Sequence, residues 1–310
     1  TDNGENRIEF SFIGTNLGGT LAFSNQIGIH IQSNQNTIGS NVARMGNLIS
    51  GNTTTGLWLD SGTNNVVLGN TIGTSFYGDE AVPNRWGITL HSDGNTIGGF
   101  STTERNLISG NDYYAIRMQG SNNRISGNHI GLNLSGDGLV ANGSAGTNIP
   151  AVLMFGDNLL GGTEIGAGNV ISGSAFGVKI HDNGRMLGNL VGTDAGGTMA
   201  LGNGTGVEML GDAQVGDGTP AGRNLISGNQ TYGVFMNGGV LNHNFIGSDA
   251  SGNQPVGNGV WGVYVVEGDV FNNIISANGK GMYSRGQDNA IQGNLIGLNA
   301  DGNAWLGNQN

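Results

Sequence analysis

The side chains best suited to chemistry recur at one position of a short repeated segment. Ten four-residue segments each begin with Gly or Ala, and their third residues include Arg117, Lys179 and Glu208. His181 directly follows one of these segments. Carboxylate and imidazole groups serve as general acids and bases, and cations stabilise negative charge as it develops. These four residues are therefore the catalytic candidates.

The same third position carries large aromatic residues elsewhere in the chain, namely Trp58, Phe235, Tyr264 and Tyr283. Aromatic rings stack on the apolar faces of sugars, while neighbouring charged and amide groups take up hydroxyls. These four residues are the candidates for binding a glycan, and the catalytic candidates are expected to act on polysaccharide if the chain is an enzyme. The alternative for the whole stripe is an ordinary solvated sheet face.

Lys179 and Glu208 belong to consecutive segments. If these segments are neighbouring strands, the two residues lie about 5 Å apart. We interpret them as a surface ion pair, which contributes little to stability, with an acid/base pair as the alternative.

The histidines that follow two of the segments, His91 and His181, are three segments apart. On the same spacing they are about 14 Å from each other, too far to share a metal or a proton relay. We expect local hydrogen-bonded pairs instead, His91 with Asp93 and His181 with Asp182.

The sequence gives little support for a metal site. Because it contains no cysteine, the chain has neither disulfides nor thiolate ligands. A polar residue recurs at one position of six turns, but on the expected spacing these copies lie about 10 Å apart. Ca²⁺ needs oxygen ligands at about 2.3–2.6 Å, so adjacent turns cannot share an ion. We expect no cofactor and no metal, with Ca²⁺ as the alternative, and interpret as Asx turns the residues Asn16, Ser75, Asn133, Asp194, Asp249 and Asn299.

A repeat that covers the whole chain must position these residues. The segment start recurs from Gly28 to Gly281 in nine steps over 253 residues, or about 28 residues per step. Nine of the ten copies have apolar second and fourth residues, the period of a strand with one buried face. Three short apolar runs per step predict an all-β, three-faced parallel β-solenoid of about 10–11 coils, roughly 50 Å long.

Composition excludes the main alternatives. Glycine accounts for 61 of 310 residues and asparagine for 43, and both favour turns over helices. Glycine is not found at every third position, so collagen is excluded. The net charge is −11 with only 11 Lys and Arg, and no basic cluster is present for nucleic acid. No apolar run approaches the length of a membrane span.

The asparagines have a structural interpretation. Stacked Asn side chains can hydrogen-bond from coil to coil, and Asn tolerates left-handed turns. We expect one set at one turn of alternate coils and a second set at another turn. The first set is Asn70, Asn128, Asn189, Asn244 and Asn294, and the second is Asn47, Asn106, Asn169 and Asn224.

The phrases Asn-Leu-Ile-Ser-Gly-Asn (from Asn47) and Gly-Asn-Thr-Ile-Gly-Thr (from Gly69) resemble the right-handed parallel β-helix repeats of the pectate-lyase-like superfamily. The resemblance is greatest to Gly/Asn-rich repeat proteins of bacterial surfaces and secretions. It implies a right-handed β-helix over essentially all 310 residues, and polysaccharide binding along one face. The site motifs of the pectin hydrolases and mannuronan epimerases are absent from the sequence. One fold serves many functions.

The sequence thus predicts residues 1–310 to be a single β-solenoid domain with an extracellular or cell-surface location. We expect a structural or adhesive role as stalk, surface-protein segment or filament subunit. A polysaccharide lyase, hydrolase or epimerase and a noncatalytic glycan-binding module are the alternatives. Residues from Asn6 match those from Asn289 in the phase of the repeat. We therefore expect the domain to be a segment of a longer array or to stack end to end with copies of itself, and we expect no nucleic-acid partner and no membrane insertion.

Overall fold

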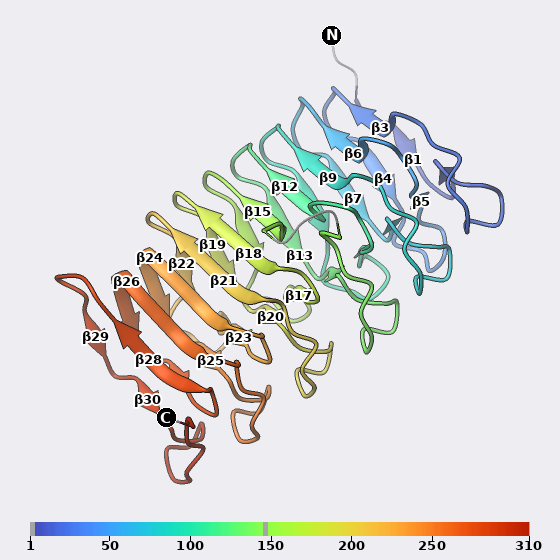
Figure 1. The fold of residues 1–310 in the computed structure, drawn as a ribbon. Helices are drawn as coiled ribbons and strands as arrows, with labels where there is room; N and C mark the ends of the chain where they lie inside the picture. The colour runs from blue at the N-terminus through green and yellow to red at the C-terminus, as the bar shows by residue number, and fades with distance from the viewer. Residues whose placement is uncertain (1–3, 145–147, 310) are drawn as a thin grey trace.

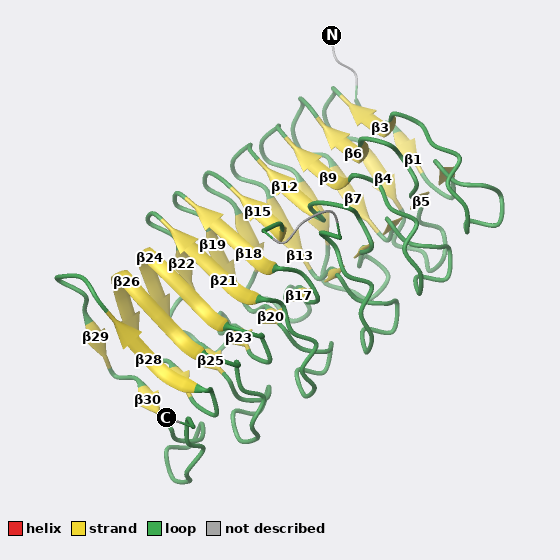
Figure 2. Ribbon diagram, in the orientation of Figure 1, coloured by secondary structure: helices red, strands yellow, loops and turns green. Residues whose placement is uncertain are grey.

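The computed structural model, which describes residues 4–144 and 148–309, is a stack of coils built from short parallel strands (Figure 1). Strands and loops make up all of it, and within these ranges no helix is long and apolar enough to cross a membrane (Figure 2). Each strand pairs in parallel with its equivalent in the next coil, as β3 does with β6. The predicted parallel β-helix is confirmed.

Each coil contributes one strand to each of three faces. The first face contains β3 Ile27–Ile31, β6 Thr55–Leu59, β9 Trp86–Leu90, β12 Ile116–Met118, β15 Pro150–Met154, β18 Phe176–His181, β21 Thr205–Leu210 and β28 Lys280–Ser284. The second contains β1 Arg7–Ile8, β4 Thr37–Gly39, β7 Val66–Leu68, β10 Thr96–Gly98, β13 Arg124–Ser126, β16 Leu159–Gly161, β19 Arg185–Leu187, β22 Gln214–Val215 and β29 Ile291–Gln292. Two long strands run across both of these faces, β24 Tyr232–Asn242 and β26 Trp261–Phe271.

Within the part of the chain that the structure describes, the third face is a separate sheet of 11 two-residue strands. They are β2 Phe12–Ile13, β5 Leu48–Ile49, β8 Thr71–Ile72, β11 Leu107–Ile108, β14 His129–Ile130, β17 Val170–Ile171, β20 Leu190–Val191, β23 Leu225–Ile226, β25 Phe245–Ile246, β27 Ile274–Ile275 and β30 Leu295–Ile296.

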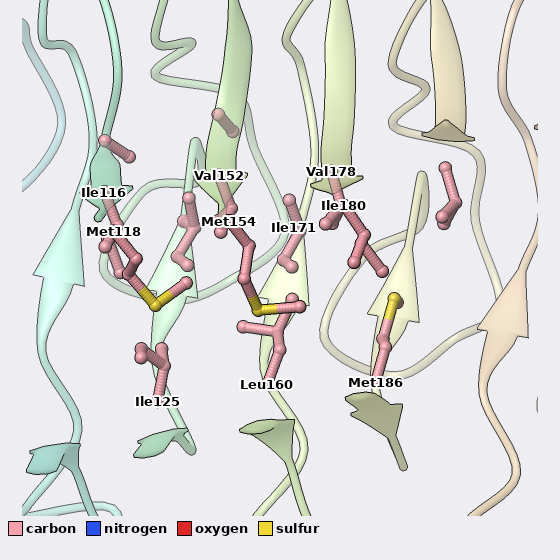
Figure 3. Close-up of a cluster of buried hydrophobic side chains, with 14 of the residues drawn as sticks. Ile116, Met118, Ile125, Val152, Met154, Leu160, Ile171, Val178, Ile180 and Met186 are labelled. Atoms are coloured by element: carbon pink, nitrogen blue, oxygen red, sulfur yellow. The ribbon is translucent and has the colours of Figure 1, made fainter. Parts of the chain in front are cut away.

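The core fills the inside of the coils. A coil contributes two apolar residues from the first face and one from each of the others (Figure 3). In one coil these are Val152, Met154, Leu160 and Ile171, all fully buried. Burial of each such side chain stabilises the fold by about 1.5–3 kcal/mol, so the alternating pattern explains why the strands form where they do.

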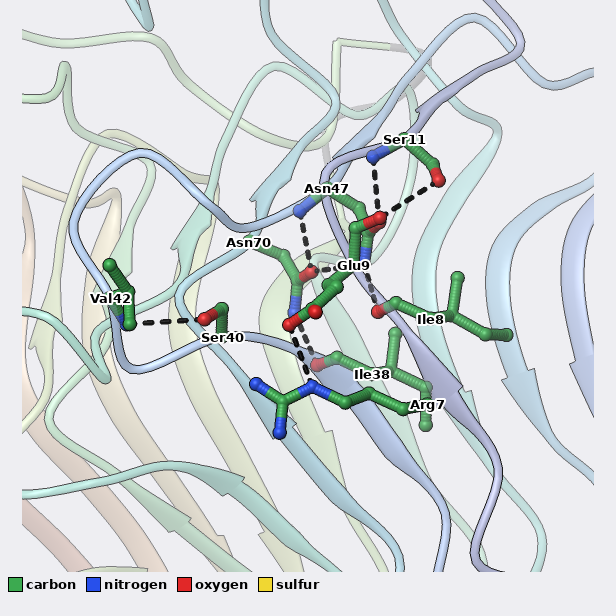
Figure 4. Close-up of polar contacts among 9 residues, drawn as sticks. All are labelled: Arg7, Ile8, Glu9, Ser11, Ile38, Ser40, Val42, Asn47 and Asn70. Atoms are coloured by element: carbon green, nitrogen blue, oxygen red, sulfur yellow. Dashed lines mark hydrogen bonds and ion pairs between the residues drawn. The ribbon is translucent and has the colours of Figure 1, made fainter.

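Asparagine ladders line the corners. At the corner before the third face each Asn Nδ2 donates to the Oδ1 of the Asn in the next coil, over 2.9–3.0 Å. Most Nδ2 groups also donate to a backbone carbonyl, as Asn47 does to Ile8 and Asn70 to Ile38 (Figure 4). The ladder thus satisfies polar groups that would otherwise be buried without partners.

Our assignment of the asparagines to two different turns was wrong. Asn47 donates to Asn70 and Asn70 to Asn106, so the two predicted sets alternate within one ladder of ten residues. The cause is that both phrases place an Asn directly before a third-face strand, Asn47 before β5 and Asn70 before β8. Separate ladders occupy the other two corners, for example Asn36 to Asn65 and Asn52 to Asn84.

The corner between the first and second faces changes along the molecule. Its ladder runs as far as Asn158, and small residues such as Gly184 and Ala213 take the place of Asn in the following coils. Further on, β24 and β26 pass through this corner as continuous 11-residue strands with register shifts. Loss of the buried amide, which favours a turn, accompanies the fusion but does not suffice for it, because β18 and β19 stay separate at Gly184, as do β21 and β22 at Ala213.

Close approach between coils fixes some of the glycines. Gly73 has φ of 92°, and a Cβ there would lie 2.4 Å from the carbonyl oxygen of Ser109. Both facts require glycine at this corner, which explains why the Ile-Gly phrase recurs along the chain.

Candidate functional site

The outward residues of the first face form one column in the predicted order. Lys179 pairs in register with Glu208, and Phe235 with Tyr264. The column reads His30, Trp58, Thr89, Arg117, Leu153, Lys179, Glu208, Phe235, Tyr264 and Tyr283. Because the strands are in register, side chains of one column can contact each other from coil to coil.

Lys179 and Glu208 form the expected ion pair. The Nζ of Lys179 lies 2.7 Å from Oε2 of Glu208, and the two side chains are 15% and 19% exposed. The same ammonium donates to Oδ1 of Asn148 at 3.1 Å and lies 3.7 Å from the ring centre of Phe176. Three partners hold the ammonium, so the pair is more enclosed than an ordinary surface ion pair.

The other two catalytic candidates contact aromatic rings. His181 stacks on Phe155 with ring centres 4.6 Å apart. Arg117, two coils before Lys179, places its guanidinium 5.9 Å from the centre of the Trp86 ring. The predicted pairing of His181 with Asp182 was wrong, because the carboxylate of Asp182 accepts a hydrogen bond from the backbone N–H of Gly156 instead.

Three of the four predicted glycan-binding residues are brought together near the C-terminal end of the first face. Phe235 stacks on Tyr264 with ring centres 5.5 Å apart, and Tyr264 lies 4.9 Å from Tyr283. Tyr232 and Trp261, which the sequence reasoning missed, extend the group through contacts to Tyr264 at 5.7 and 6.4 Å. We call these five residues the aromatic patch.

Two cations border the aromatic patch. Lys280 Nζ lies 4.9 Å from the centre of the Trp261 ring, and the guanidinium of Arg285 lies 5.7 Å from that of Tyr264. Four of the five rings are half-buried and Tyr283 is 41% exposed, so ring surface remains open to solvent. The signal for Tyr232 and Trp261 was available in the sequence, because each directly precedes the opening Gly of a segment.

The fourth predicted residue, Trp58, belongs to a different cluster at the other end of the column. Its ring stacks on His30 at 4.4 Å, and its Nε1 donates to Nδ1 of His91 at 3.3 Å. Asp60 joins the cluster through contacts of 3.1 Å to His30 and 3.8 Å to His91, and it accepts from Gln32 at 2.9 Å. The predicted partner of His91 was therefore wrong, since Asp60 takes the place of Asp93.

Hydrogen bonding controls the charge of Asp60. The bond from Gln32, followed by that from His30, lowers its pKa below the ordinary value of an aspartate. Asp60 therefore stays ionised and accepts hydrogen bonds. Within the described ranges no group of three or more His, Asp or Glu side chains is arranged to hold a metal ion.

The six polar turns are hairpin loops that follow the third-face strands, each closed by an antiparallel bridge such as Thr15 to Ala22. Successive hairpins contact each other directly, since the Phe76 N–H donates to the Gly19 carbonyl at 2.9 Å. The expected Asx turns are wider than predicted. Asn299 accepts from residues four and five positions on, Asn303 and Ala304.

In comparisons with known proteins, no protein-family model, no curated protein and no solved structure matches this chain.

Proposed function

We propose that this chain is an extracellular structural or adhesive β-solenoid whose aromatic patch binds polysaccharide without cleaving it. The observation that supports the proposal most is the contact group of Tyr232, Phe235, Trp261, Tyr264 and Tyr283, with open ring surface bordered by Lys280 and Arg285. Aromatic faces suit sugar rings, and the two cations favour an anionic polymer. Under this proposal the chain is grouped with the Gly/Asn-rich surface repeat proteins of the pectate-lyase-like superfamily.

The other polar interactions support a role as a structural scaffold. The buried asparagines are engaged in ladders that join coil to coil, and Lys179 and Glu208 neutralise each other. A structural rod needs such interactions, whereas a catalytic acid or base must be free to exchange a proton with substrate.

Electrophoresis through gels that contain neutral or anionic polysaccharides tests the binding. We expect an anionic polymer to retard the wild type and Tyr264→Ala to abolish the retardation. Trp305→Ala is the matched control, because Trp305 is 84% exposed and lies on the last hairpin, outside the aromatic patch. Equal retardation of the wild type and Tyr264→Ala would reject the patch as the binding site.

A polysaccharide lyase or glycoside hydrolase is the second candidate. It is favoured by the position of Arg117, Lys179, His181 and Glu208 on one face within four consecutive strands. Release of unsaturated or reducing sugar ends from a polysaccharide panel, lost in Glu208→Gln, would support it over the scaffold.

We also propose that the chain associates end to end, either with further coils of a longer chain or with copies of itself. In the ladders each Asn donates toward the following coil, as Asn25 does to Asn52 and Asn278 to Asn308, so a ladder has an acceptor end and a donor end. Ends of opposite kind are complementary. Electron micrographs with filaments of coil-like width would support this, and isolated rods about 50 Å long would reject filament formation.

A further inference from the structure

The outer side of the third face has an open half and a closed half. Near the C-terminus, Leu225, Phe245 and Ile274 form a small second core, against which Leu190, Leu295 and Ala300 pack. Near the N-terminus the corresponding surface is a groove of about 490 Å³, within the range of small-molecule sites.

The floor of the groove crosses four strands and its rim is apolar. Leu48, Thr71, Leu107 and His129 follow one another in register along β5, β8, β11 and β14. Three strand spacings make this floor about 14 Å long. Large apolar side chains stand exposed around it at 36–66%, namely Phe10, Phe12, Val42, Phe76, Tyr77 and Leu134. Such a patch is uncommon on a surface that contacts only water.

Two arginines also line the groove, and among the described residues neither has an ion-pair partner. Arg44 forms no salt bridge, and Arg105 donates from Nε only to the carbonyl of Gly127 at 3.2 Å. The adjacent acid, Glu104, is engaged with Phe100 and Ser101 in its own loop. Arg105 is half-buried, so its cation is partly removed from water, and this burial lowers its pKa. A guanidinium that is partly removed from water is normally paired with an acid or another anion.

The repeat itself provides the contrasting case. Arg223 precedes its ladder asparagine as Arg105 does, and its guanidinium lies 4.0 Å from the ring centre of Phe245 in the next coil and contacts His243. At the position equivalent to Phe245, the coil after Arg105 has His129. The closed half thus satisfies its arginine internally, whereas the open half does not.

His129 adds an unpartnered polar group at the floor. The residue is 2% exposed, and neither ring nitrogen makes a hydrogen bond to a described residue. Burial, followed by the charge of Arg105, lowers its pKa to about 4, while the nearby Asn133 carbonyl opposes the shift. His129 is therefore neutral at pH 7 and leaves Arg105 as the charge at this end of the groove.

We propose that the groove binds an amphipathic monocarboxylate with an extended apolar chain, whose carboxylate pairs with Arg105 and whose chain lies against the exposed apolar rim above Leu48 and Leu107. The guanidinium of Arg105 supplies charge-assisted hydrogen bonds to a carboxylate. The apolar rim covers the chain, and Arg44 adds a second positive charge to the lining of the groove.

Isothermal titration calorimetry of the full chain with decanoate tests the proposal, and decyltrimethylammonium is the matched probe with the opposite charge. We expect saturable binding of one decanoate and at least tenfold weaker binding of the cation. Arg105→Gln weakens decanoate binding at least tenfold, whereas Arg223→Gln at the closed position leaves it unchanged.

A second variant tests the groove in case Arg105→Gln does not fold. Leu134 is 61% exposed, so Leu134→Glu leaves the core intact while repelling a carboxylate, and we expect at least tenfold weaker binding of decanoate. Absence of saturable binding to the wild type would overturn the site. Equal binding of the two probes, or of the wild type and Arg105→Gln, would overturn the role of Arg105. The aromatic patch is on another face, so Tyr264→Ala does not affect the result.

Discussion

Asn128 shows how much depends on a single buried amide. Its Oδ1 accepts from the backbone N–H and from Nδ2 of Asn106, and its own Nδ2 donates to Asn169 and to the carbonyl of Ile97. Asn128→Ala leaves these buried groups without partners. We expect the free energy of unfolding to fall by about 3 kcal/mol, measured by urea denaturation.

Asn183 provides the control for that measurement. Its side chain is exposed and lies in a turn outside the ladders, so Asn183→Ala is expected to change stability by less than about 0.5 kcal/mol. If the two alanine variants unfold at the same urea concentration, the ladders do not carry the stability assigned to them.

The ion pair of Lys179 and Glu208 should have a measurable coupling energy. Its side chains are only 15% and 19% exposed, between the exposed pairs that contribute about 0–1 kcal/mol and fully buried ones. A double-mutant cycle with Lys179→Met and Glu208→Gln should give a coupling of about 1 kcal/mol in unfolding experiments. A coupling near zero would show that Asn148 and Phe176 alone hold the lysine.

Sequence reasoning at this scale succeeded where the repeat fixes position and failed where side chains choose partners. The order of the outward column followed from the alternation alone, because the register keeps equivalent residues in line. The partner of His91 did not follow. Asp93 is near in sequence, but Asp60 occupies the position equivalent to His91 one coil earlier, directly after its strand, and reaches the ring. In a solenoid, contacts between coils therefore compete with contacts along the chain.

The hairpins that contain an aspartate should weaken in acid. Burial alone raises the pKa of Asp249, but hydrogen bonds from Gln254, Ser251 and Asn253 outweigh it, and the net pKa lies below the ordinary value. Asp194 behaves in the same way. Their contribution to stability is complete above the ordinary aspartate pKa of about 4 and is lost as pH falls through the lowered value. Urea denaturation at pH 6 and pH 3 measures the loss.

The repeat supplies the control for this prediction. Asn299 accepts the same two backbone hydrogen bonds in its hairpin without a titrating group. The double variant Asp194→Asn, Asp249→Asn should therefore lose less stability between pH 6 and pH 3 than the wild type. Other carboxylates with lowered pKa, such as Asp60, continue to titrate, so part of the loss remains. An unchanged loss in the double variant would show that the hairpins do not contribute to it.

At the scale of elements, the positions of the strands were predictable and their lengths were not. The four-residue segments correspond to the first-face strands, because alternation marks buried residues directly. The fusion of first-face and second-face strands in β24 and β26 was not predicted. It depends on which residues occupy the corner, where Gly239 and Gly268 stand at the position that Asn occupies in the first coils.

At the scale of the whole molecule, the two proposed binding sites lie on different faces. The first face carries the aromatic patch, and the third face carries the groove beside Arg105. Its architecture followed from the sequence because every coil repeats the same three apolar runs. The difference between the open and closed halves of the third face did not follow, since it rests on single exchanges such as His129 for Phe245.

The chain length of a polysaccharide that the protein retains is the most direct test of a solenoid that binds without cleaving. After prolonged incubation with the wild type, size-exclusion chromatography with light scattering should show a retained anionic polymer of unchanged mass. If the wild type shortens that polymer and Glu208→Gln does not, the result would contradict the account and identify an enzyme.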